Sequence, residues 1–199
     1  MRRLRLAFCV LSLAAMPLLA GCGTFRETFP ERSATEQFLI SKAVDRAAED
    51  LPAYWMHGKA IYLDATNLDC IDRPYVVQRL RDLVLSHGGR LVEDRESAEV
   101  ALEVASGGLS MDKGHWLLGL PELPLPIPFA DETLVFPEVP LFKLITYAGK
   151  SKLLVSAVTV ADGTQARDLP LCLGKSHHRY LWLLFVGPFT LSDLHKDIR

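Results

Sequence analysis

The stretch that decides the fold reads Glu99-Val100-Ala101-Leu102-Glu103-Val104-Ala105. Every second residue from Val100 to Val104 is a large aliphatic one, so these side chains fall on one side of an extended chain. Such alternation is typical of a strand that is buried on one face. We therefore expect a sheet with one covered face, and the flanking segments indicate what covers it.

Two helices are predicted before this strand. Ser33-Ala34-Thr35-Glu36 matches a capping box, in which the serine accepts a hydrogen bond from the third backbone N–H and the glutamate reaches back to the cap. The first helix then extends to about Asp50. A second begins after Asp72, with Pro74 in its first turn, and ends at Gly88-Gly89.

Further strands are predicted between the two helices and after the strand that begins at Glu99. Residues 58–65 read as a first strand, and residues 141–147 and 152–160 read as two strands joined at Gly149-Lys150. The order of elements indicates an α+β fold, with two helices packed on one face of a mainly antiparallel sheet. Asp162-Gly163 is a turn signal, after which residues 164–168 could return as a hairpin. Residues 180–189 read as a last apolar strand, rich in aromatics and broken by Gly187-Pro188.

Residues 114–140 break this pattern, because they contain six prolines among large apolar residues. Proline at this density argues against a helix or a central strand, so we expect an irregular insertion. One interpretation is an exposed arm that docks on a partner or a membrane surface, and the other is a loop buried over its own core. The candidate contact residues are Trp116, Leu118, Leu120, Leu123, Leu125, Ile127 and Phe129.

The N-terminal segment has the parts of a bacterial export signal. Three arginines precede an apolar run from Leu6 to Leu19, which is shorter than the roughly 20 residues needed to span a bilayer. The run ends in Leu19-Ala20-Gly21-Cys22, which resembles the lipobox, where a signal peptidase cuts before a cysteine that carries a diacylglyceryl group. The alternatives are an ordinary secretory signal with an incidental cysteine, or an N-terminal helical anchor.

We expect residues 1–21 to be the signal peptide, 22–32 a tether lipidated at Cys22, and 33–199 a single periplasmic domain. Two or three acyl chains would hold such an anchor stably, and Gly23, by resemblance to Gram-negative lipoproteins, favours the outer membrane. Removing the signal takes away three of 22 basic residues and none of 24 acidic ones, which leaves a net charge of −5. A mildly acidic domain is a poor candidate for binding nucleic acid.

The chemistry-bearing residues do not form a recognisable catalytic motif, so we predict no catalytic residue, metal site or cofactor. His177-His178 are interpreted as loop histidines, and Asp64, Asp69 and Asp72 as turn and cap residues. Cys70 and Cys172 remain once Cys9 leaves with the signal and Cys22 carries lipid. In an oxidising compartment they either form a disulfide or stay as two buried thiols.

The chain resembles a family of uncharacterised bacterial outer-membrane lipoproteins. The resemblance rests on Gly21-Cys22-Gly23-Thr24-Phe25-Arg26-Glu27-Thr28, followed by Ser33-Ala34-Thr35-Glu36-Gln37, and on the later segments 118–121, 123–126 and 141–143. It implies Cys22 as the lipid acceptor and no particular activity. Residues 88–94, which lead through Ala98 into a strand, are also similar to α/β domains of envelope lipoproteins in curli secretion and cell-wall synthase activation.

These observations favour a non-enzymatic outer-membrane lipoprotein that faces the periplasm and acts through protein contacts in envelope assembly or export. Its expected partners are the membrane, through the lipid, and an envelope protein or a second copy of itself. The insertion and the aromatic strand 180–189 are the expected contact surfaces. The alternatives are a carrier of small molecules or lipids that uses the apolar segment as a pocket wall, and an envelope hydrolase.

Overall fold

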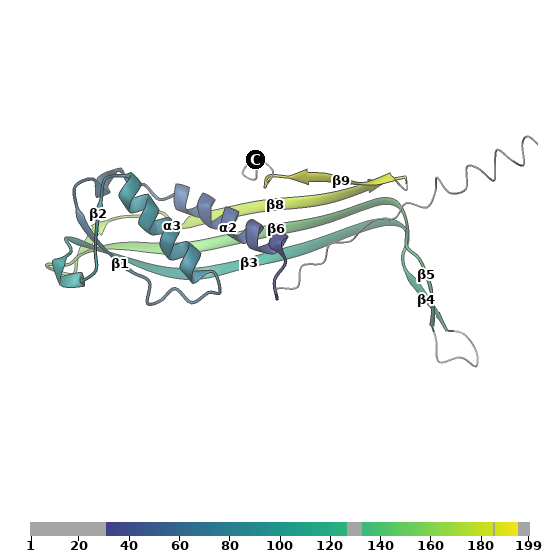
Figure 1. The fold of residues 1–199 in the computed structure, drawn as a ribbon, viewed down its shortest axis with the longest axis horizontal. Coiled ribbons are helices and arrows are strands. Elements are labelled where there is room, and N and C mark those ends of the chain that lie inside the picture. The colour runs from purple at the N-terminus through teal and green to yellow at the C-terminus, as the bar shows by residue number, and fades with distance from the viewer. Residues whose placement is uncertain (1–30, 127–132, 185, 195–199) are drawn as a thin grey trace, which may run out of the picture. The chain divides into compact units, whose positions relative to one another are not determined.

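The computed structural model describes residues 31–126, 133–184 and 186–194, and the chain from Arg32 onward forms one compact unit. In this unit two α-helices pack on a seven-stranded mixed sheet, and a separate two-stranded ribbon extends from one end of the long strands (Figure 1). The predicted α+β class is therefore confirmed. Cys22 and the rest of the lipobox lie outside the described residues.

The sheet has the order β2-β1-β3-β6-β8-β9, and β7 pairs with β6. β1 runs parallel to β2 and β3, and the other pairs are antiparallel. The elements are α2 (Ala34–Glu49), β1 (Ala60–Asp64), α3 (Arg73–Ser86), β2 (Arg90–Val92), β3 (Val100–Leu120), β4 (Leu123–Pro126), β5 (Thr133–Phe136), β6 (Val139–Thr159), β7 (Gln165–Arg167), β8 (Cys172–Leu183) and β9 (Val186–Ser192), with short 3₁₀ turns at Tyr54–Met56 and Arg95–Ser97.

The two helices begin where the sequence predicts, and one arginine joins their N-termini. Ser33 Oγ accepts from the Glu36 N–H at 3.2 Å, as the capping box requires. The Glu36 carboxylate accepts instead from Arg32 Nε at 3.0 Å. The same guanidinium donates to both oxygens of Asp72, at 3.0 and 3.1 Å, so Asp72 binds Arg32 rather than capping α3. Hydrogen bonds between charged groups are stronger than those between neutral groups, which explains why Arg32 binds the carboxylates of both Glu36 and Asp72.

Helix α2 lies on the sheet at positions without bulky side chains. A Cβ at Gly174 would lie 1.7 Å from the carbonyl oxygen of Ala43, and a Cβ at Gly149 would lie 2.3 Å from that of Leu39. Ser176 Oγ donates to the same Leu39 carbonyl at 2.6 Å. Gly149, Gly174 and Ser176 therefore form a helix seat on β6 and β8. The predicted break at Gly149-Lys150 is wrong, because β6 continues through it and Gly149 serves helix contact.

The core fills the space between the helices and the sheet. Val100, Leu102 and Val104 point into it, as the alternation predicts. They meet Val44 from α2 and Val84 from α3, together with Val76, Leu80, Leu153, Val155 and Ala157. No helix in the described part of the chain combines the length and apolarity needed to cross a membrane.

Two sequence-based boundaries are wrong. The segment 114–140 is not irregular where it is described: β3 extends to Leu120, and β4 pairs with β5 in a ribbon. Both strands of a two-stranded ribbon are edges, which is where a sheet tolerates prolines. The last strand, 180–189, is two antiparallel strands, because β8 ends at Leu183 and β9 returns beside it from Val186.

Candidate functional site

β3, β6 and β8 continue beyond the helices that cover their other ends (Figure 1). The row Lys113–Tyr147–His178–Ser192 lies just past the helix seat and crosses four hydrogen-bonded strands. We call the sheet from this level onward the distal sheet; it comprises residues 112–120, 139–148, 177–183 and 186–192. Because side chains alternate along each strand, successive rows across the distal sheet point to opposite faces.

The face turned away from the helices carries two complete apolar rows. Residues paired directly across strands share a face, so the register gives the members of each row. One row is Leu118–Phe142–Leu183–Val186, and the next is Trp116–Leu144–Leu181–Phe189. We call these eight residues the apolar face.

The apolar face is open in the described structure. Trp116 is 64% exposed, Leu118 58%, Val186 60% and Phe189 49%. The rings of Trp116 and Phe142 meet edge to face at 6.0 Å. The following rows are more polar, with Thr146 and Arg179 and then Asp112 and His177. The result is a bounded apolar patch rather than scattered exposed residues, and such patches mark interaction sites.

The helix-side face of the distal sheet carries a chain of aromatic rings in edge-to-face and tilted contact. Tyr180 contacts three rings: Tyr147 at 6.2 Å, His178 at 4.7 Å and Trp182 at 6.0 Å between centroids. Lys113 lies over Tyr147 at 5.6 Å, and Lys143 lies over Trp182 at 5.3 Å. We call this set the aromatic face; its ring contacts and cation–π pairs help to hold the side chains in place.

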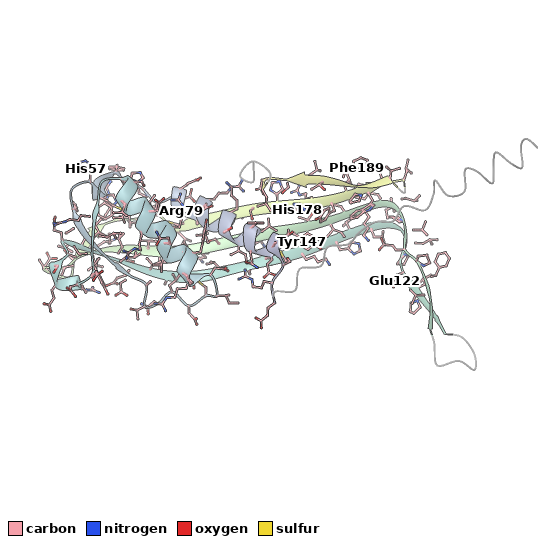
Figure 2. All side chains as sticks on the ribbon, in the orientation of Figure 1. His57, Arg79, Glu122, Tyr147, His178 and Phe189 are labelled. Atoms are coloured by element: carbon pink, nitrogen blue, oxygen red, sulfur yellow. The ribbon has the colours of Figure 1, made fainter. Side chains whose placement is uncertain are left out.

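A small cavity of about 140 Å³ marks where the helix cover ends. It lies between Ser33 and Thr35 at the start of α2 and Met111, Tyr147 and Tyr180 of the sheet. Figure 2 labels Tyr147 and His178 near this end of α2, and Phe189 on β9 farther along the strands.

The contact residues predicted from the sequence fall in three places. Trp116 and Leu118 belong to the apolar face, and Leu120 and Leu123 are 53% and 45% exposed near the ribbon. The side chain of Leu125, and all of Ile127 and Phe129, lie outside the described residues. The predicted contact strand 180–189 supplies Leu181, Leu183, Val186 and Phe189 to this face, but sequence reasoning missed the contribution of β6. The signal was the alternation of Phe142 with Leu144, which matches that of residues 116–118.

A larger cavity, of about 540 Å³, opens beside the start of α2. Its walls are Arg32, Glu36, Ile40, residues 69–72 and residues 106–111, so the described part of the proline-rich segment beyond β3 does not line it. Arg32 is its cation, and the hydrogen bonds that its guanidinium donates to Asp72 and Glu36 raise the pKa of Arg32. The charge is therefore already neutralised within the protein.

The two adjacent histidines lie in β8 and not in a loop, which corrects the sequence interpretation. His177 Nδ1 is 3.2 Å from Asp193, and the His177 backbone N–H donates to the other Asp193 oxygen at 2.9 Å. Arg46 of α2 also contacts Asp193, at 2.5 Å. Burial alone would raise the pKa of Asp193, but the bonds from His177 and Arg46 outweigh it and lower this pKa. Asp193 therefore acts as a charged link between α2 and the distal sheet.

Two of the other candidate carboxylates, Asp64 and Asp72, have structural partners. Asp64 accepts from the Thr66 N–H at 3.0 Å and contacts Arg95 at 3.3 Å, and these bonds, chiefly those from Thr66, lower its pKa. Asp72 binds Arg32, as described. Within the described residues no three His, Cys, Asp or Glu side chains are close enough to hold one metal ion.

Cys70 and Cys172 are free thiols in the structure, so the disulfide that the sequence left open is not formed. Ser106, Leu153 and Cys172 share one row, which places Cys172 two strands, or about 10 Å, from β3. Cys70 is held on the β3 side, because Ser106 Oγ donates to the neighbouring Asp69 carbonyl at 2.9 Å. A disulfide needs Cα atoms within about 7 Å. Burial raises the pKa of Cys172 to about 11, which keeps this thiol protonated.

Comparison with known proteins gives one match. A family model described as a family of unknown function (DUF6655) matches residues 15–197, which is most of the chain. No curated protein and no solved structure matches it.

Proposed function

The chain belongs to this family of unknown function, and we propose its role from the geometry of the domain. We propose an outer-membrane lipoprotein that faces the periplasm and acts without catalysis, through protein contacts made by the distal sheet during envelope assembly or export. The observation that carries the proposal is the apolar face, in which eight large apolar side chains form two uninterrupted rows across four strands.

The physical argument begins with the cost of leaving this face in water. Soluble monomers rarely expose a contiguous apolar patch of several hundred square ångströms. Burial against a partner recovers roughly 25 cal/mol for each Å² of apolar surface removed from water. Aromatic residues such as Trp116 and Phe189 are enriched among the residues that dominate binding energy at protein interfaces.

A non-enzymatic role is supported by how the reactive groups are used. Asp64, Asp72 and Asp193 each bind an arginine that fixes a helix or a loop. Cys172, the buried thiol, has a pKa of about 11 and is a poor nucleophile at neutral pH.

The lipid anchor is tested by Cys22→Ser in the full chain. We expect the wild-type protein to sediment with membranes and to be released by detergent, and the variant to appear in the soluble periplasmic fraction. Cys70→Ser is the matched control, since Cys70 is half-buried in the folded domain. A Cys22→Ser variant that still fractionates with membranes would contradict the anchor.

The contact surface is tested by crosslinking in intact envelopes. We expect the double variant Trp116→Ser/Leu118→Ser to lose the proteins that wild type captures. The matched control is Leu154→Ser/Leu173→Ser, because these leucines are 53% and 52% exposed on the same sheet face but at its helix-covered end. Equal capture by both double variants, or no captured protein at all with wild type, would contradict this role for the apolar face.

A further inference from the structure

The distal sheet has two free edges among the described residues. β3 pairs with β1 only from Val100 to Glu103, so its outer edge carries no strand from there to Leu120. β9 pairs with β8 on one side and with no described strand on the other. Free edges present unpaired N–H and C=O groups, which pair readily with another strand.

Both edges lack charged side chains along most of the distal sheet. Proteins block edges with charged side chains, prolines, β-bulges, very short strands or a covering element. β9 has one such residue, Pro188, near its start, so the part of this edge available for pairing is residues 189–192. β9 has seven residues and no charged one, and β3 has no Asp, Glu, Lys or Arg from Gly114 to Leu120. Edges of this composition can pair with a strand of another molecule.

The two edges are complementary in direction and in level. β3, β6, β8 and β9 alternate in direction, so β9 of one molecule runs antiparallel to β3 of another molecule in the same orientation. The register places Ser192 level with Lys113, and Val186 level with Leu118. A rotation that relates copies at one level therefore brings these two edges together.

We propose that a second copy of this chain is the partner of the distal sheet, with the β9 edge of one copy pairing with the β3 edge of the next. This inference rests on the proposed function and names its partner. The pairing is head to tail, so every copy uses both edges, and a rotation that closes on itself gives a ring of copies. It also extends the apolar rows across the junction, because Phe189 and Val186 end them on one edge and Trp116 and Leu118 end them on the other.

The β9 edge can be blocked without disturbing β8. The Asp193 N–H donates to the His177 carbonyl at 3.2 Å, so the backbone N–H and C=O of Asp193 face β8. In an antiparallel pair these groups alternate in direction from residue to residue. The N–H and C=O of Leu191 therefore face β8, and those of Thr190 point outward. Thr190→Pro removes an outward donor, whereas Thr190→Val keeps it. We expect the detergent-purified full chain and Thr190→Val to have a mass of several copies, and Thr190→Pro to be a monomer with an unchanged unfolding midpoint.

A cysteine test keeps the proposal falsifiable if Thr190→Pro misfolds. Thr190→Cys is combined in turn with Lys113→Cys, His115→Cys or Leu117→Cys, which lie on the same sheet face of β3, and treated with a short thiol crosslinker in membranes. At least one double variant should give a ladder of covalent dimers, trimers and larger species. The single variants, which retain Cys70 and Cys172, should give none.

Several outcomes would overturn the inference. A monomeric wild-type protein, or no ladder from any double variant, excludes edge pairing between copies. Covalent dimers from Thr190→Cys alone would show a two-fold β9–β9 contact instead. If the chain crosslinks only to a different envelope protein through Trp116 and Leu118, the proposed function stands and the self-pairing fails. If it binds only lipid vesicles, both fail.

Discussion

The helix-covered part of the sheet and the distal sheet are built from the same strands, yet they carry different side chains. Under α2, β8 presents Gly174 and Ser176, and two residues farther along the same face it presents His178 and then Tyr180. The small residues admit a helix backbone, and the large rings occupy the space where a helix would lie. The comparison shows that the size of the residues along one face of a strand decides how far the helix can cover it.

The largest expected difference between the two parts concerns glycine. Gly174→Val should lower the free energy of unfolding by about 3 kcal/mol or more, because the new side chain meets the backbone of Ala43 and not a movable side chain. Gly114→Val in the distal sheet is the control, since the nearest atoms to a Cβ there are 3.9 Å away. Urea denaturation followed by circular dichroism measures both, and equal losses would contradict the difference.

Leucine truncation gives the second contrast. Leu153 is 1% exposed and Leu118 is 58% exposed. Leu153→Ala should cost about 2–5 kcal/mol in unfolding free energy. Leu118→Ala should change it by no more than about 0.5 kcal/mol at concentrations where the chain is monomeric. A comparable loss for Leu118→Ala in monomers would mean that the apolar face is covered within its own chain.

Asp193 links the two parts and gives a pH-dependent effect. Asp193→Asn should cost about 1–2 kcal/mol at neutral pH, because Arg46 and His177 lose a charged acceptor. The pKa of Asp193 is lowered from 3.8 in the folded protein, so its contribution is present above that value and is lost as the pH falls through the lower folded pKa.

The free energies of unfolding of wild type and Asp193→Asn should therefore differ above about pH 4, and the difference should shrink as the pH falls below that value. Asp82→Asn serves as the control, since the Asp82 side chain is 67% exposed. A difference that persists at pH 2 would show that Asp193 acts through packing and not through its charge.

The smallest expected effect concerns the reactivity of the cysteine thiols. In native protein at pH 8, a cysteine at position 118 should react on the order of 100-fold faster than Cys172, whose pKa is about 11. After denaturation without reductant, Cys70 and Cys172 should both react with Ellman's reagent. If neither Cys70 nor Cys172 reacts with the reagent after denaturation, the two residues form a disulfide instead.

Sequence reasoning found the elements whose signals are local. Ser33 caps α2 through a bond three residues away, and Val100 to Val104 alternate within one strand. It failed where one residue serves a distant contact. Gly149 looks like a turn residue, but the Leu39 backbone that it admits is 110 positions earlier in the chain.

The distal sheet was only partly predictable for a related reason. Trp116 and Leu118 attracted attention because prolines follow them, but the rows that they begin depend on the register of β6, β8 and β9. Register comes from pairing across the sheet, and no single segment of sequence specifies it.

The helix seat also has a consequence for the order of folding. Leu39 and the Ser176 that binds it are separated by 137 residues, so α2 cannot reach its final contacts until nearly the whole chain has been made. Contacts between such distant residues slow folding, because a long loop must close before they form. The first of the two described helices in the chain is then the last to be covered, and its apolar stripe stays exposed until β8 has joined the sheet.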